Sequence, residues 1–151
     1  MVLDWQNVIT LTETNTLTAG VNAERSQAVN TGFGNIDDSQ TLDGLFAQDQ
    51  WSPLARWHFT AGGRYDHYDT FGGQTTGRAT AAWDMTPATK LRASFGTGFR
   101  APGFLELYGH DTGYTGNPQL RPEHARGWDL GIDQNLGTRA QASVTWFQDD
   151  F

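Results

Sequence analysis

The sequence lacks cysteine, long apolar runs and an excess of basic residues, and each absence excludes a class of protein. Without cysteine there are no disulfides and no thiolate chemistry. No run of 18 apolar residues occurs, so no membrane-spanning helix is predicted. Lys and Arg total 10 against 17 Asp and Glu, so no basic stripe is available for a phosphate backbone. We therefore expect no nucleic-acid partner.

The residues that are plentiful favour strands. The chain has 18 Gly, 6 Trp, 4 Tyr and 9 Phe, and lysine and glutamate, which favour helices, are few. This composition is typical of an all-β chain. The N-terminus has neither the basic start nor the apolar core of a signal peptide. We interpret the chain as a mature part, or a piece, of something larger.

Side chains alternate between polar and apolar with a period of two. The segments 57–65 and 91–100 alternate most cleanly. Each segment is about ten residues long, which suits a tilted strand crossing a bilayer, whereas soluble strands are usually about 5–6 residues. The eight predicted strands are Leu3–Thr12, Leu17–Ser26, Thr41–Trp51, Trp57–Tyr65, Thr75–Asp84, Leu91–Arg100, Arg126–Asn135 and Arg139–Asp149.

The connections between these strands alternate in length. Short turns at 13–16, 52–56, 85–89 and 136–138 alternate with longer connections at 27–40, 68–74 and 101–125. Outer-membrane barrels show this asymmetry, with short periplasmic turns and long extracellular loops. The sequence therefore predicts an antiparallel up-and-down transmembrane β-barrel wall of about eight strands.

Aromatic residues are expected near both ends of the strands. Trp57 and Trp83 lie beside short turns, while Tyr65, Trp128 and Trp146 lie toward the long loops. Such girdles suit a membrane barrel because amphipathic rings settle at the headgroup level. We expect Trp57, Phe59, Ala61, Leu91, Ala93 and Phe95 to face lipid or an apolar partner, and Arg64, Asp66, Arg92 and Arg100 to face inward. The direction of Trp51 is left open.

Residues 91–133 carry a set of motifs that resembles the late barrel region of TonB-dependent receptors. The pieces, in the order and spacing of that family, are Gly96–Pro102, Glu106–Gly109, Gly116–Pro118, Leu120–Glu123 and Gly127–Gly131. Weaker similarities lie at 46–49 and 63–66. We expect the resemblance to cover the whole chain, and it is strongest in the last 65 or so residues.

The resemblance implies a partial receptor barrel domain over residues 1–151, similar to cobalamin and siderophore receptors. It implies location in a Gram-negative outer membrane, contact with outer-membrane lipid, and a non-enzymatic role in the uptake of ferric siderophores, haem or cobalamin. It also implies coupling to the TonB system through a plug domain that this chain lacks. We expect no cofactor, and possible self-association through open strand edges. Eight strands also suffice for an autonomous barrel, membrane-embedded or a soluble small-ligand binder, and that alternative stays open.

Candidate ligand-binding residues lie in the longest connection, because binding residues often sit on loops carried by a rigid scaffold. They are Tyr108, His110, Tyr114, Asn117 and Arg121. The histidines form no HExxH or comparable metal pattern, so a metal site or a hydrolase is disfavoured. Asp37, Asp38 and Asp43 offer oxygen ligands for calcium, although solvated carboxylates are the commoner explanation. We predict neither a metal nor catalytic residues.

Overall fold

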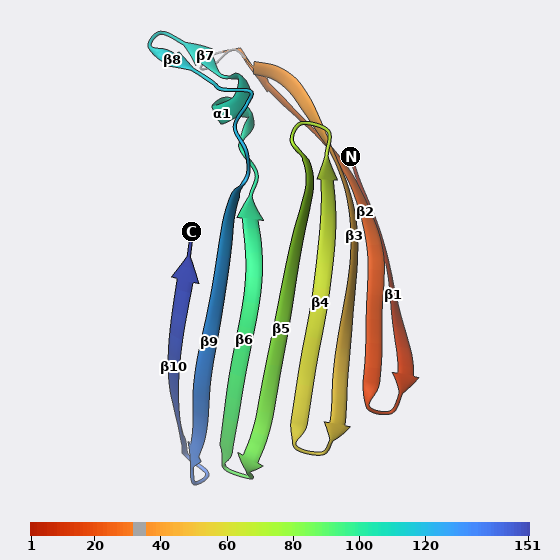
Figure 1. Cartoon of the computed structure of the whole chain (residues 1–151), viewed down its shortest axis with the longest axis vertical. Helices are drawn as coiled ribbons and strands as arrows, with labels where there is room; N and C mark the ends of the chain where they lie inside the picture. The colour runs from red at the N-terminus through yellow and green to blue at the C-terminus, as the bar shows by residue number, and fades with distance from the viewer. Residues whose placement is uncertain (32–35) are drawn as a thin grey trace.

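The strands follow one another in a single antiparallel sheet. The computed structural model describes residues 1–31 and 36–151. The eight strands of the main sheet are β1 (Val2–Thr12), β2 (Asn15–Asn30), β3 (Ile36–Leu54), β4 (Trp57–Tyr68), β5 (Gly72–Thr86), β6 (Thr89–Arg100), β9 (Glu123–Leu136) and β10 (Ala140–Asp150). Their spatial order is β1-β2-β3-β4-β5-β6-β9-β10, so the strands lie in the order of the chain (Figure 1). The predicted all-β, up-and-down architecture is confirmed.

The sheet is open in the part of the chain that the structure describes. β1 pairs only with β2, and β10 only with β9, so the two outermost strands do not meet. The closed eight-stranded barrel that the sequence left open as an alternative is therefore not the fold observed. Both outer strands leave backbone donors and acceptors along a free edge, which is where further strands can pair.

The sequence predicted the central part of each strand correctly but made several strands too short. β2 and β3 pair from Asn15↔Trp51 to Asn30↔Ile36, so most of the predicted long connection 27–40 is a hairpin stem. The connection after β4 is likewise only residues 69–71. Polar residues continue these strands because cross-strand backbone bonds do not require apolar side chains. Residues 32–35 of the predicted connection lie outside the described residues.

The longest connection carries structure that the sequence did not predict. It contains the helix α1 (Phe104–Tyr108) and a small hairpin of β7 (His110–Asp111) and β8 (Tyr114–Thr115). We call α1, β7 and β8 the cap. Figure 1 shows the cap at one end of the sheet, opposite the turns that join β1–β2, β3–β4, β5–β6 and β9–β10. In the described residues, no helix is long and apolar enough to cross a membrane.

The two faces of the sheet differ in chemistry. The side of the sheet that carries Trp57 is called the apolar face. Its larger residues include Leu3, Trp5, Val21, Leu45, Trp51, Phe59, Tyr65, Trp83, Leu91, Phe95, Trp128, Leu130, Ile132, Val144 and Trp146. Many remain exposed, Phe95 at 49% and Trp146 at 61%. The opposite side, the polar face, carries the predicted inward residues Arg64, Asp66, Arg92 and Arg100. A sheet that exposes so much apolar surface requires an apolar environment or a partner.

Aromatic rings gather on the apolar face beside the short turns. Trp57 stacks on Trp83 at 5.2 Å between ring centroids and on Phe59 at 5.8 Å. Trp51 lies 6.1 Å from Phe59, so it belongs to the same face, which answers the direction that the sequence left open. An exception to the apolar character is Asp49, which accepts a hydrogen bond from Asn15 at 3.2 Å.

Glycines let long side chains lie flat across neighbouring strands. A Cβ at Gly20 would lie 2.5 Å from the carbonyl oxygen of Trp5 and 2.6 Å from the ring of Phe46. A Cβ at Gly44 would similarly lie 2.5 Å from Nη2 of Arg64. These positions therefore exclude any larger residue unless the covering side chain moves.

We expect Gly20→Ala to destabilise the protein by about 1–3 kcal/mol, because the methyl group overlaps a backbone oxygen that cannot move alone. The matched control is Gly98→Ala, since a Cβ there meets nothing within 4 Å. The measurement is the free energy of unfolding from denaturant titration of both variants. Equal stabilities would contradict the overlap at Gly20.

Candidate functional site

The polar face carries an ion pair, with a buried carboxylate, that links neighbouring strands. Arg64 on β4 pairs with Asp66 two residues along the same strand, Nη2 to Oδ1 at 2.6 Å, and Asp66 is only 5% exposed. The same guanidinium donates to Asn22 on β2 at 3.2 Å and lies 6.0 Å from the ring centroid of Phe46 on β3. Side chains of three strands thus meet at one charge pair, which supports their register on this face.

A second network joins β6, β9 and β10. Arg92 donates from Nε to Asp133 at 3.2 Å, and its Nη1 lies 3.7 Å from Asp129. Asp133 also accepts from Ser143 at 2.7 Å. A Cβ at Gly131 would lie 2.6 Å from the guanidinium carbon of Arg92, so glycine is the residue that lets Arg92 cross β9. The network joins the last strand to the rest of the sheet.

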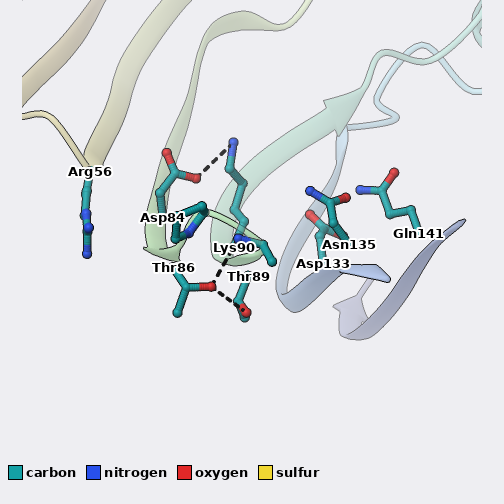
Figure 2. Close-up of a pocket in the computed structure, with 10 residues that line it drawn as sticks. Arg56, Asp84, Thr86, Thr89, Lys90, Asp133, Asn135 and Gln141 are labelled. Atoms are coloured by element: carbon teal, nitrogen blue, oxygen red, sulfur yellow. Dashed lines mark hydrogen bonds and ion pairs between the residues drawn. The ribbon is translucent and has the colours of Figure 1, made fainter. Parts of the chain in front are cut away.

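A polar hollow lies beside the short turn that joins β5 and β6. It has a volume of about 470 Å³ and is lined by Arg56, Asp84, Thr86, Pro87, Ala88, Thr89, Lys90, Asp133, Asn135 and Gln141. Figure 2 shows Lys90 reaching Asp84, at 3.4 Å, and Thr86 donating to Thr89 at 3.0 Å. The charges facing the hollow from β5 and β6 are therefore already paired.

Next to this hollow, a chain of hydrogen bonds passes through His58. Its Nδ1 lies 3.0 Å from Oγ of Ser52, and its Nε2 lies 3.1 Å from Oδ2 of Asp84. The sequence did not reveal this grouping, because the three residues come from three different strands. Since Asp84 also pairs with Lys90, the chain connects β3, β4, β5 and β6 at the short-turn end.

The cap at the other end begins with a charged anchor. Glu106 accepts from the Gly103 backbone N–H at 2.7 Å and from Arg100 at 2.5 Å. These bonds, the first from Gly103 and the second from Arg100, hold the pKa of Glu106 below its ordinary value. Arg100 also lies 3.5 Å from Glu123 on β9. The start of α1 is thereby attached to the ends of β6 and β9.

Three of the five predicted ligand residues lie in α1 or pack around it. The Tyr114 hydroxyl donates to the carbonyl of Leu105 at 3.0 Å, and the backbone N–H of Asn117 donates to the carbonyl of Glu106 at 2.8 Å. Burial raises the pKa of the Tyr108 phenol, and nearby acidic charges add smaller contributions. Tyr114 and Asn117 therefore help to hold the loop on itself.

The other two predicted residues, His110 and Arg121, are exposed. His110 lies in β7, and Arg121 lines a groove of about 620 Å³. One side of the groove is formed by Thr70, Phe71 and Gln74, and the other by residues 118–122 and His124. The structure thus places Tyr108, His110 and Tyr114 on the cap, Asn117 in backbone contact with α1, and Arg121 across a groove from the start of β5.

The aspartates considered for calcium do not converge. Asp37 and Asp38 lie in β3 and not in a loop, and Asp37 accepts from Gln27 at 3.3 Å. Asp43 lies on the apolar face, opposite His67 of β4. Over residues 1–31 and 36–151, no group of three or more His, Cys, Asp or Glu residues is arranged to hold a metal ion.

Comparison with known proteins gives a consistent family. A family model described as TonB dependent receptor-like, beta-barrel, matches residues 2–151. The chain is 30% identical over 131 residues to the vitamin B12 transporter BtuB of Photobacterium profundum, covering 87% of this chain and 21% of that protein. It is 32% identical over 112 residues to the iron-regulated outer membrane virulence protein of Vibrio cholerae, covering 70% and 17%. The chain thus spans about a fifth of the length of these curated relatives.

Solved structures agree on the fold. The siderophore receptor PirA from Pseudomonas aeruginosa superposes with a TM-score of 0.84 at 18% identity, over 98% of this chain and 30% of that one. The copper transporter OprC gives a TM-score of 0.74 at 18% identity, over 98% and 29%. At these identities the likeness shows a shared fold, that is, the same arrangement of strands.

The anchor at Glu106 makes the cap sensitive to acid. A carboxyl group whose pKa is lowered on folding stabilises the fold above its unfolded value, and this contribution is lost as pH falls through the folded value. We therefore expect the backbone amides of α1 to lose protection, measured against the intrinsic exchange rate at the same pH, below about pH 4.5, near the ordinary pKa of a glutamate.

The variant Glu106→Gln should show this loss of protection already at neutral pH, and the matched control is Glu13→Gln, because Glu13 lies in the turn between β1 and β2 at the opposite end of the sheet. Hydrogen exchange read by mass spectrometry measures both variants. Slow exchange of α1 in Glu106→Gln at neutral pH would contradict the anchoring role.

Proposed function

This chain belongs to the TonB-dependent receptor family through its β-barrel, and we propose that it forms part of the wall of an outer-membrane receptor for a small nutrient. The observation that carries the proposal is the division of the sheet into two faces. One face exposes rings and aliphatic side chains, and the other carries crossed ion pairs. A wall between lipid and a polar lumen requires this division, because lipid-facing and lumen-facing residues alternate along each strand.

The proposed orientation puts the cap outside the cell. In such barrels the short turns are periplasmic and the longer loops extracellular. The turns that join β1–β2, β3–β4, β5–β6 and β9–β10 all lie at one end, and α1 lies at the other. Trp57 and Trp83 then lie at the periplasmic headgroup level, where amphipathic rings are favoured.

The ligand is proposed to be a ferric siderophore, haem or cobalamin, a range that the names of relatives support in part. The proposed contacts are Tyr108, His110 and Arg121, with Tyr114 and Asn117 holding the loop that presents them. Arg121 supports this role because its guanidinium makes no hydrogen bond or ion pair with described residues and it faces a groove. Coupling to TonB, through a plug domain supplied by polypeptide outside residues 1–151, completes the proposal.

We expect Phe95→Arg to destabilise the protein in a bilayer by about 2–4 kcal/mol, the cost of a cation at the midplane of the lipid face. Phe95 lies opposite Ala79 and Trp128, in the middle of the apolar face. The matched control is Thr80→Arg, which places the same cation on the polar face of β5 and should cost much less.

The measurement for this pair is the folded fraction in lipid vesicles against urea concentration. Equal destabilisation by the two arginines would contradict the assignment of the apolar face to lipid.

Uptake by cells tests the transport role. A strain whose gene encoding this chain is deleted should lose energy-dependent uptake of a ferric siderophore, haem or cobalamin, and the intact gene on a plasmid should restore it. The deletion strain with an empty plasmid is the control. Unchanged uptake of all three ligand classes after deletion would contradict the proposal.

A further inference from the structure

Two adjacent strands separate near the cap. β5 and β6 pair from Thr86↔Thr89 up to Arg78↔Gly96, and no further. Their other neighbours continue, because β4 pairs with β5 up to Gly72 and β6 pairs with β9 up to Arg100. Figure 1 shows β5 and β6 drawing apart toward the end where α1 lies. The space between the two unpaired edges, residues 72–77 of β5 and residues 97–100 of β6, is called the slot.

The slot leaves backbone groups of both edges without a strand partner. In the described residues one hydrogen bond crosses it, from the Gly77 N–H to Oγ1 of Thr97 at 3.0 Å. A Cβ at Gly98 would meet nothing within 4 Å, so the sheet face above this part of β6 is uncovered. A strand edge that faces an open space is a site where an extended segment can add as a strand, through main-chain hydrogen bonds.

Side chains, and not backbone, close the end of the slot nearest the cap. The rings of Tyr68 and Phe99 meet edge to face there, with 6.0 Å between their centroids. Tyr68 also stacks on Phe71, in the turn between β4 and β5, at 4.3 Å. Contact with an entering segment can replace the contact between these two rings. Ring contacts do not require one specific partner, whereas the hydrogen bonds of a backbone ladder do.

Two hollows border the slot, and His124 lines both. One groove of about 620 Å³ lies between the start of β5 and residues 118–124. A second hollow, of about 450 Å³, has Thr75 on one side and Thr97, Gly98 and Arg126 on the other. Alternate side chains of a strand point to opposite faces, so an added strand would direct every second side chain toward these hollows.

The unpaired charges at the slot are positive. Arg78 lies where the pairing of β5 and β6 ends, between Gly62 and Gly96 on the polar face, and Arg121 lines the groove beside the start of β5. Neither side chain makes a hydrogen bond or an ion pair with the residues that the structure describes. The other cations of the polar face each pair with a carboxylate; they are Arg64, Lys90, Arg92 and Arg100.

We propose that the slot is a docking site for an extended, acidic segment of polypeptide that adds as a strand between β5 and β6. Backbone hydrogen bonds to the two free edges hold the segment, the rings of Tyr68 and Phe99 part to admit it, and its carboxylates pair with Arg78 and Arg121. The edge of β5 that faces β6 is unpaired over six residues, 72–77, so a segment of the same length is about 20 Å long at about 3.3 Å per residue. This inference rests on the slot and does not depend on which nutrient the protein takes up.

Two blocked hexapeptides test the charge preference. One alternates glutamate and valine, the other alternates lysine and valine, and each carries a fluorescent label. Fluorescence anisotropy with the full chain in mild detergent should show saturable binding of the acidic peptide and at least about tenfold weaker binding of the basic one, roughly the effect of one charge-assisted hydrogen bond. Equal binding of the two, or no binding of the acidic peptide, overturns the proposal.

A third peptide tests strand addition. It has the acidic sequence with alternate backbone nitrogens methylated, so it keeps every charge and loses donors to one edge. We expect it to bind about tenfold more weakly than the unmodified peptide. Unchanged binding would mean that the arginines attract any anion, and would overturn docking as a strand.

Variants of this chain locate the site. Arg78→Gln and Arg121→Gln should each weaken the acidic peptide by about tenfold. Arg56→Gln is the matched control, because Arg56 lies at the short-turn end and should leave binding unchanged. If Arg78→Gln and Arg121→Gln both bind as the control does, the peptide lies elsewhere and the slot is not its site.

Discussion

The structure depends on one constraint, that every backbone N–H and C=O of a wall strand needs a partner while its side chains alternate between two environments. Pairing the strands in chain order meets the first demand with turns of two or three residues at one end. Alternation then separates rings such as Trp57 and Trp83 from ion pairs such as Arg64–Asp66. In lipid, where water cannot satisfy backbone groups, this arrangement is one of the few that can span.

The constraint also shows where the wall departs from regularity. Between β5 and β6 the ladder ends at Arg78↔Gly96, next to the family-like motif Gly96–Pro102. Glycine and threonine are frequent on both unpaired edges, and glycine adds no side-chain packing to hold strands together. The outer strands β1 and β10 are a second departure, because each has one edge without a neighbour in the described residues. Open edges are where this wall can accept other polypeptide.

The charges on the polar face follow from the same geometry. Glycine leaves room for long side chains to lie across a neighbouring strand, as Arg92 does over Gly131 and Arg64 over Gly44. Arg92 then meets a carboxylate on β9, and Arg64 meets one on its own strand while it donates to β2. The glycines are therefore part of the charge network. Glycine on the polar face thus serves both packing and electrostatics, without itself forming a ligand site.

The sequence by itself determined the strand number, the chain-order topology and the faces of Phe95 and Arg92, because a period of two assigns each side chain to a side. The local sequence also determined the short turns. In the turn between β9 and β10, Gly137 adopts a positive φ. Tertiary structure alone decided the length of the β2–β3 hairpin, the slot beside Arg78 and the hydrogen-bond chain through His58. These features depend on register between strands, and register brings together residues that no local pattern relates. The same reason separates the predicted loop residues, since contacts with α1 engage Tyr114 and Asn117 while Arg121 faces a groove.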